Sequence, residues 1–120
     1  MLLLIVASAY GLLKLEAWSL NNCSGDLAFT IFDDVSFTKN ISNWRPSYSF
    51  QLSRELQGQE QLDLSLTGNL ASWYANKDQL STNSSSCEIF LQTYTAENGS
   101  TICHAVPQFT CHRLWVNSGL

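Results

Sequence analysis

The sequence predicts a single all-β domain, an antiparallel β-sandwich or β-barrel, from its composition and from the alternation of apolar residues. Of 120 residues, 45% are hydrophobic, 12% aromatic and 13% charged, which is enough apolar material for a core and too little charge for a disordered chain. Leu62, Leu64 and Leu66 alternate with polar residues before Gly68-Asn69, as in a strand with one buried face. The length fits one domain.

The other predicted strands follow from the same period and from β-forming residues. Tyr48, Phe50 and Leu52 alternate with serine and glutamine. Leu27–Phe32 is mostly apolar and is followed by Asp33-Asp34, a predicted turn. We therefore expect strands at both places.

Two C-terminal segments complete the predicted fold, together with one short helix. Glu88–Thr95 is rich in Ile, Phe, Tyr and Thr, and Asn98-Gly99 predicts a hairpin turn after it. Pro107 lacks a backbone donor, so we expect the second strand of this hairpin to end there and the chain to turn. Leu70, Trp73, Tyr74 and Lys77 have helical spacing, which allows one short helix within Asn69–Leu80.

The four cysteines predict two disulfides. With a turn at Pro107, Cys103 and Cys111 lie opposite each other at disulfide distance. We therefore predict Cys103–Cys111 and, by elimination, Cys23–Cys87. A straight strand would instead hold Cys103 and Cys111 about 27 Å apart.

The N-terminus resembles a secretory leader. Leu2–Leu13 is apolar, and Ala17-Trp18-Ser19 offers small residues at positions −3 and −1. The sequence thus predicts a signal peptide at residues 1–19 and a secreted, extracellular β-domain at residues 20–120, although no basic residue precedes the apolar run. The alternatives are a buried helix or a misassigned start codon. The run is shorter than the ~20 residues of a membrane span, so none is expected.

Four glycosylation sequons support the secretory route. They begin at Asn22, Asn40, Asn83 and Asn98. The first has Cys23 as its middle residue, so a disulfide there competes with glycosylation. The other three fall in predicted loops.

Catalytic and metal-binding patterns are weak. Cys103-His104 and Cys111-His112 could be imagined as four metal ligands, but adjacent strand residues point to opposite faces and the spacing matches no zinc motif. We expect no metal and no cofactor. The alternative function, a small secreted hydrolase of a polysaccharide or ester, would have to use His104, His112 or the carboxylates of Asp33 and Asp34.

Aromatic residues point to binding instead. Trp44, within the predicted polar loop Asn43–Pro46, and the pair Trp73 and Tyr74 are the candidate binding residues for an extracellular protein or glycan. The net charge of −4 and the lack of a basic cluster exclude nucleic acid as an expected partner.

One family resemblance agrees with this interpretation. A cysteine soon after the leader, the stretch Leu27–Thr38 and then Tyr48–Leu52 resemble small secreted fungal β-barrel proteins typified by the major allergen of moulds. The chain lacks the cysteine that this family has soon after the position of Trp73-Tyr74, so no functional residue is transferred. The resemblance implies an effector-like role without catalysis. An immunoglobulin-like recognition domain is the alternative fold, but Trp44 lies 21 residues after Cys23, which is too far for that pattern.

Overall fold

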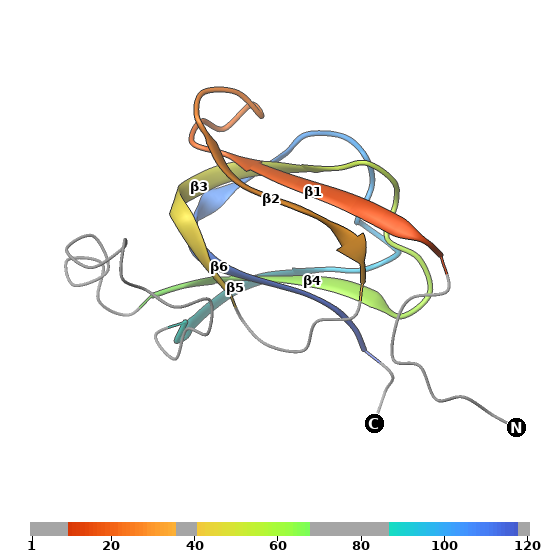
Figure 1. Cartoon of the computed structure of the whole chain (residues 1–120). Helices are drawn as coiled ribbons and strands as arrows, with labels where there is room; N and C mark the ends of the chain where they lie inside the picture. Colours follow the sequence, from red (N-terminus) through yellow and green to blue (C-terminus); the bar gives the residue numbers. More distant parts are fainter. Residues whose placement is uncertain (1–9, 36–40, 68–86, 118–120) are drawn as a thin grey trace, which may run out of the picture.

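The computed structural model describes residues 10–35, 41–67 and 87–117 (Figure 1). The predicted helix at Asn69–Leu80, the pair Trp73 and Tyr74, and the sequons at Asn40 and Asn83 lie outside these residues. Within the described ranges, no helix is long and apolar enough to cross a membrane.

Within the described residues, six strands form one antiparallel sheet with the order β2-β1-β3-β6-β4-β5. All-β architecture is thus confirmed, and the described residues contain no helix. The strands are β1 (Leu12–Trp18), β2 (Leu27–Asp34), β3 (Ile41–Leu52), β4 (Glu60–Leu66), β5 (Ile89–Tyr94) and β6 (His104–Val116).

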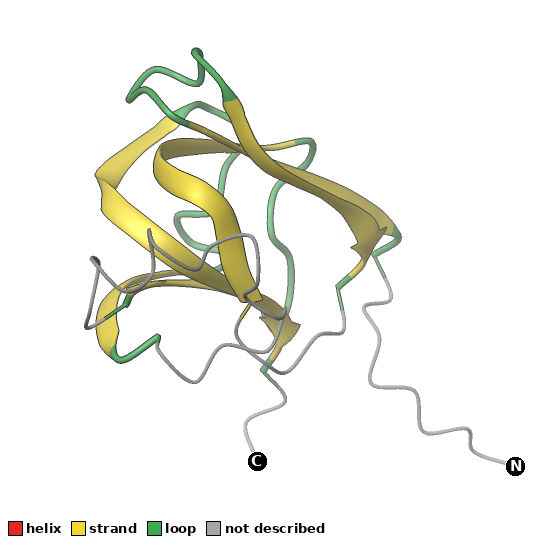
Figure 2. Cartoon of the chain, turned by 60° about the vertical axis from the view of Figure 1, so that its left-hand side comes forward, coloured by secondary structure: helices red, strands yellow, loops and turns green. Residues whose placement is uncertain are grey.

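The sheet curls so that β1 and β2 face the half formed by β4, β5 and β6 (Figures 1 and 2). Phe29 of β2 stacks on His112 of β6, with ring centroids 3.8 Å apart, although two strands separate β2 from β6 in the sheet order. Phe29 also meets Phe109 edge-to-face at 6.4 Å. One sheet therefore encloses the core in the manner of a sandwich or an open barrel.

The core collects the inward-facing residues of these strands. Phe50 and Phe109 are fully buried at its centre, and Tyr94 closes it beside Phe50. Because side chains alternate across each strand, every second residue contributes. The other buried apolar members are Leu13, Leu15, Ala17, Ala28, Val35, Leu52, Leu56, Leu62, Leu64, Val106 and Leu114.

Strand β1 comes from the segment that the sequence assigns to the leader. It pairs with β2 on one side and β3 on the other, and Leu15 lies opposite both Ile31 and Leu52. Leu13, Leu15 and Ala17 are at most 1% exposed. Removal of residues 1–19 would delete this strand from the sheet. The predicted boundary at Ser19 stays a prediction.

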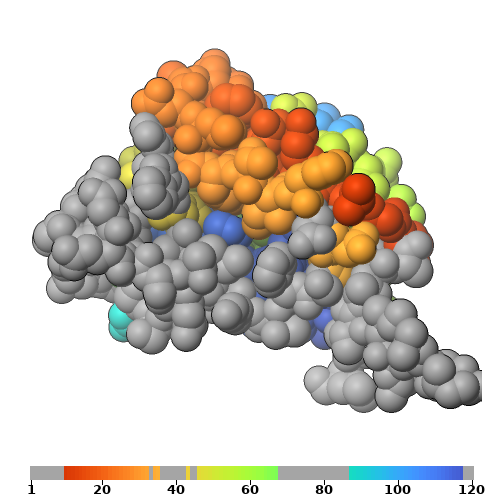
Figure 3. Space-filling view, viewed as in Figure 1, coloured from red at the N-terminus to blue at the C-terminus, as the bar shows by residue number. Residues whose placement is uncertain are grey.

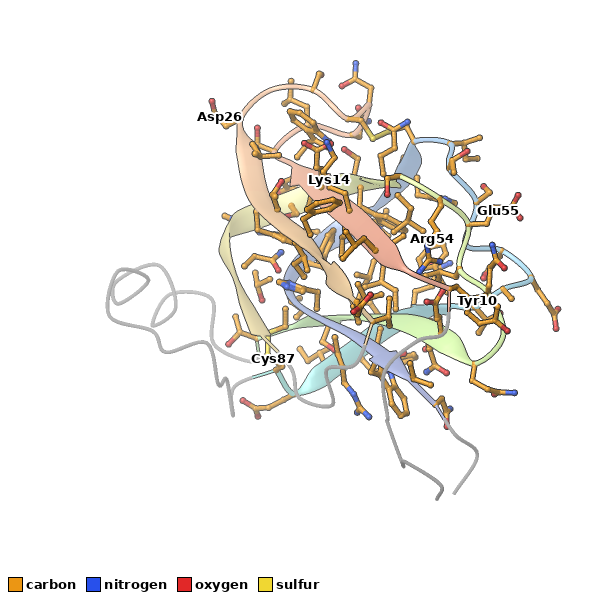
Figure 4. The ribbon with its side chains drawn as sticks, turned by 45° about the vertical axis from the view of Figure 1, so that its right-hand side comes forward. Tyr10, Lys14, Asp26, Arg54, Glu55 and Cys87 are labelled. Atoms are coloured by element: carbon orange, nitrogen blue, oxygen red, sulfur yellow. A yellow bond between two sulfur atoms is a disulfide. The ribbon has the colours of Figure 1, made fainter. Side chains whose placement is uncertain are left out.

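A partly buried ion pair fixes the start of β1. Arg54 contacts both carboxylate oxygens of Glu60 at 2.8 Å and donates to the carbonyl oxygens of Gly11 and Leu12 at 2.8 and 3.1 Å. The Glu60 side chain is only 1% exposed. The hydrogen bond to Glu60 raises the pKa of Arg54, and this effect outweighs burial, which lowers it. Figure 4 shows Arg54 close to Tyr10 at this end of β1.

Two segments predicted to leave the sheet belong to it. Asp33 and Asp34 are the last residues of β2, not a turn, and pair with Leu13 and Leu12. The polar segment Asn43–Pro46, predicted as a loop, lies within β3. The β3–β6 register is irregular between Ser42 and Ser47. Pro46 has no amide proton, and it lies in this stretch, where the regular hydrogen bonds between the strands are interrupted.

The predicted hairpin at Asn98-Gly99 is wrong. Strand β5 pairs with β4, and β6 pairs with β3 and β4. A type I′ turn needs positive φ at both central residues, but neither Asn98 nor Gly99 has it. Instead, the Asn98 Oδ1 atom accepts from the Thr95 amide at 2.7 Å, and the Gly99 carbonyl accepts from Leu56 at 2.9 Å.

Pro107 does not end a strand either. It lies inside β6, where the register with β3 shifts between the pairs Ser47–Phe109 and Ser49–Ala105. Pairing of β6 with β4 begins only at Cys111. The proline therefore sits in an irregular stretch that does not need its amide proton.

The two disulfides are confirmed in number but not in pairing. The structure joins Cys23 to Cys103 and Cys87 to Cys111, each with Cα atoms 5.9 Å apart. The predicted pairs Cys103–Cys111 and Cys23–Cys87 are wrong because Cys103 directly precedes the same continuous strand that contains Cys111. Two disulfides are compatible with an oxidising, extracellular compartment.

Candidate functional site

An open pocket lies beside the loop that connects β1 and β2. Its volume is about 330 Å³, and Ser19, Leu20, Asn21 and Tyr48 line it. The first three residues follow β1 directly, and Tyr48 comes from β3. In the space-filling view, the red-to-orange atoms of β1, β2 and their loop form the upper part of the surface (Figure 3).

The pocket offers apolar and polar groups together. Tyr48 is 37% exposed and Leu20 is 53% exposed. Asn21 is exposed beside them. An exposed tyrosine ring provides a flat apolar surface, and the asparagine amide can both donate and accept hydrogen bonds. The pocket could therefore hold a ligand with one apolar face and several hydroxyl groups.

Backbone hydrogen bonds close the loop that carries the pocket. The Ser19 amide donates to the Asp26 carbonyl at 2.9 Å, and the Asp26 amide donates back to the Ser19 hydroxyl at 2.8 Å. The Leu20 amide donates to the Ser24 carbonyl at 3.2 Å. These bonds give the loop a defined shape.

Ser49 of β3 holds this loop in place through hydrogen bonds of its side chain. Its hydroxyl is buried, accepts from the Cys23 amide at 2.9 Å and donates to the Leu20 carbonyl. The Cys23–Cys103 disulfide adds a covalent link to the residue before β6. The loop is thus fixed to two other parts of the fold.

Glycine is required where the loop folds back on itself. Gly25 has φ of +85°, which L side chains rarely adopt. A Cβ atom there would lie 2.6 Å from Ser19 Oγ and 2.7 Å from Leu20 Cγ. The glycine therefore lets the backbone pack against two residues of the pocket wall.

The described lining of the pocket does not test the residues predicted to bind. Trp73 and Tyr74 lie outside the described residues, and only the backbone of Trp44 is described. All three remain predictions. Ser19 and Tyr48 were not predicted to bind, because Ser19 lies in the predicted leader and strand alternation placed Tyr48 on the core face.

Two of the four sequons can be placed. Asn22 is exposed, and its Oδ1 atom accepts from the Ser24 hydroxyl, while Cys23 between them is disulfide-bonded. Asn98 is also exposed, and its side chain caps the loop after β5. Glycosylation at all four positions stays a prediction.

Both histidines make contacts within the fold, His112 fully buried and His104 partly buried. His112 is 2% exposed, its Nδ1 atom lies 2.7 Å from Asn43 Oδ1, and burial lowers its pKa to about 3. The His104 ring stacks on Phe50, and its Nε2 atom lies 2.9 Å from the Ser100 carbonyl oxygen. His112 is thus closed to substrate, and His104 is committed to packing.

The carboxylate of Asp63 is also satisfied internally. Asp63 accepts from Trp115 Nε1 at 2.8 Å, from the Thr93 hydroxyl at 2.7 Å and from Gln61 Nε2 at 2.8 Å. Arg113 covers the Trp115 ring at 3.6 Å. Three donors hold this carboxylate in a network across β4, β5 and β6.

The two Cys-His pairs do not form a metal site. Both cysteines are oxidised, each to a different partner. Among the described residues, no three metal-ligating side chains gather in one place. A disulfide sulfur is neither the thiolate ligand of a zinc site nor a nucleophile.

Comparison with known proteins finds no matching family model, no matching curated protein and no matching solved structure.

Proposed function

We propose that this chain is an extracellular, non-enzymatic binding domain that recognises a glycan through the pocket of Ser19, Leu20, Asn21 and Tyr48. The observation that carries this proposal is a ring-lined pocket on a loop fixed by a disulfide and by Ser49. A fixed loop loses little conformational entropy when a ligand binds, so weak polar contacts still yield affinity.

The pocket suits a small saccharide. Its volume of about 330 Å³ is at the lower end of the range for small-molecule sites, roughly 300–1,000 Å³. Tyr48 would stack on the apolar face of a sugar ring, and the Asn21 amide would bond to its hydroxyl groups. None of the described residues that line the pocket is charged, which favours a neutral ligand.

The alternative, a secreted hydrolase, has less support. A hydrolase would use His104 or His112, and both are engaged in packing or hydrogen bonds. The side chain of Asp33 is not among those that the structure describes. No specific observation favours it.

The test begins with a screen of the secreted protein against immobilised neutral oligosaccharides, followed by calorimetry with the best binder. Tyr48→Ala should weaken binding at least tenfold, which corresponds to about 1.4 kcal/mol, whereas Tyr48→Phe should keep most of the affinity. Asn21→Ala should also weaken it. The control is Phe90→Ala, which removes an aromatic ring that is 63% exposed on β5, at the far edge of the sheet.

Two results would overturn the proposal. One is the absence of any glycan binding at millimolar concentration, including the case in which only a protein partner is found. The other is equal loss of affinity in Tyr48→Ala and Phe90→Ala, because a specific pocket predicts that only the first variant is affected.

A further inference from the structure

The Cys23–Cys103 disulfide lies beside the pocket and outside the sheet. Cys23 is in the loop between β1 and β2, two residues after Asn21 of the pocket lining, and Cys103 directly precedes β6. Neither cysteine belongs to a strand, so this bond can open while the pairing of the six strands stays in place. Its loss would therefore change the loop and leave the sheet intact.

Burial separates this bond from the second disulfide. Cys23 and Cys103 are both partly exposed, whereas Cys111 is 0% exposed within β6. Thiol–disulfide exchange releases one cysteine as a thiolate, and apolar surroundings disfavour that charge. Attack on the sulfur of Cys87 would expel the thiolate of Cys111 into the interior. A thiol reagent should therefore open Cys23–Cys103 first.

The intact bond holds a backbone conformation that cysteine rarely adopts. Cys23 has φ of 57°, and among the described residues it is the one non-glycine residue with positive φ. This conformation costs an L residue about as much free energy as one hydrogen bond contributes. The other described contacts of Cys23 are its amide's hydrogen bond to Ser49 Oγ at 2.9 Å and a weak contact of Sγ with the Phe50 carbonyl oxygen at 3.3 Å. Once the disulfide opens, these contacts barely balance the backbone cost.

Relaxation at Cys23 reaches the pocket through one side chain. The Ser49 hydroxyl that accepts from the Cys23 amide also donates to the carbonyl oxygen of Leu20, a lining residue. Movement of Cys23 away from Ser49 therefore disturbs the position of Leu20.

We propose that Cys23–Cys103 is a redox switch for the pocket, which a dithiol opens in the folded protein. One thiolate of the dithiol attacks a sulfur of the bond, the S–S bond breaks, and the released cysteine thiolate takes a proton. The second thiol of the dithiol then displaces the other cysteine from the mixed disulfide. The protein disulfide gains two electrons and two protons, and the dithiol loses them and becomes a cyclic disulfide.

Control of glycan binding by this switch rests on the function proposed above. The opening of the bond and the release of the loop involve no ligand, so both are tested on the ligand-free full chain. If the loop is released and no glycan binds to the oxidised protein, the proposed function fails and the switch stands.

The first experiment measures which disulfide opens. The oxidised full chain is incubated with increasing dithiothreitol without denaturant, and the free thiols are alkylated and located by peptide mapping. We expect alkylation of Cys23 and Cys103 while Cys87–Cys111 stays bonded and the far-ultraviolet circular dichroism of the sheet is unchanged. Earlier reduction of Cys87–Cys111, or reduction of both bonds together with loss of the sheet signal, overturns the proposal.

The second experiment measures the loop by amide hydrogen exchange. The amides of Leu20, Cys23 and Asp26 donate hydrogen bonds within the loop or to Ser49. In the protein with Cys23 and Cys103 reduced, they should exchange at least about threefold faster than in the oxidised protein, while the amides of β4 exchange as before. Unchanged exchange of the three loop amides overturns the proposal.

Two matched variants test the role of the backbone conformation. Both carry Cys103→Ser, and they differ only in having Cys23→Ser or Cys23→Gly. Glycine adopts positive φ without the penalty of a side chain, so the loop amides should exchange more slowly in the glycine variant than in the serine variant. Equal or faster exchange in the glycine variant overturns the proposal, because relief of the backbone conformation then does not release the loop.

Discussion

Acid should destabilise this domain through one buried histidine. His112 is enclosed between Phe29 and the core, and its Nδ1–H donates to Asn43 Oδ1. The Asn43 amide is oriented by its own donation to Ser47 Oγ and the Phe109 carbonyl, so its oxygen faces the ring. A second proton on the imidazole would place an uncompensated charge in this interior.

The magnitude follows from proton linkage. The pKa of His112 is about 3 in the folded state, against about 6.5 in an unfolded chain. The unfolded state therefore binds the proton first, and stability is complete above pH 6.5 and falls as the pH drops toward 3. Between pH 7 and pH 4.5 the loss from this group is about 2.5 kcal/mol, a large part of the roughly 5–15 kcal/mol typical of a small domain.

Urea denaturation followed by tryptophan fluorescence at pH 7, 6, 5 and 4.5 measures this loss. His112→Phe keeps a flat ring against Phe29 but cannot titrate, so it should be less stable at pH 7 yet show a pH dependence flatter by about 2.5 kcal/mol. His104→Phe, the matched change at the other histidine, should keep the acid-dependent loss. An equally steep fall in His112→Phe would refute the reasoning.

Two further outcomes are expected. A chain that starts at Tyr10 should fold. A chain that starts at Leu20 loses Leu13, Leu15 and Ala17 from the core, about 5 kcal/mol of apolar burial, so it should show neither cooperative urea unfolding nor a near-ultraviolet circular dichroism signal. Cooperative unfolding of this shorter chain would contradict the role given to β1. A non-reducing peptide map should yield Cys23–Cys103 and Cys87–Cys111. Replacing both cysteines of one disulfide by serine should lower the free energy of unfolding by about 4.5 kcal/mol for the first and about 3.5 kcal/mol for the second, because they join residues 80 and 24 positions apart. Equal or reversed losses would count against an entropic origin of the stabilisation.

The strands that alternation predicted are present, because period-two burial is a local property. Leu62 and Leu64 point into the core from β4, and Phe50 and Leu52 do so from β3. Tyr48 breaks the pattern because the β3 register shifts next to it, between Ser47 and Ser49. A bulge changes which face a residue occupies, and the sequence carries no signal for it other than Pro46.

The pairing of strands that are distant in the sequence could not be predicted from short sequence patterns. The hairpin at Asn98-Gly99 was inferred from two residues, but β4 takes the place beside β5 through contacts that no short motif encodes. The disulfide prediction depended on a turn at Pro107, and it was wrong because β6 continues through that proline. The pocket at Tyr48 was missed because strand alternation placed Tyr48 on the buried face and because one lining residue, Ser19, lies in the predicted leader.

The order in which the cysteines are synthesised runs against their native pairing. Cys23 and Cys87 leave the ribosome before either of their partners, Cys103 and Cys111. Oxidation during synthesis would first join Cys23 to Cys87, a bond that this fold does not contain. Native protein then requires thiol–disulfide exchange once β6 is complete, which takes seconds to hours and depends on an isomerase. The last 20 residues of the chain would thus control the yield of correctly bonded protein, and a truncation there should accumulate the wrong isomer rather than a partly folded native one.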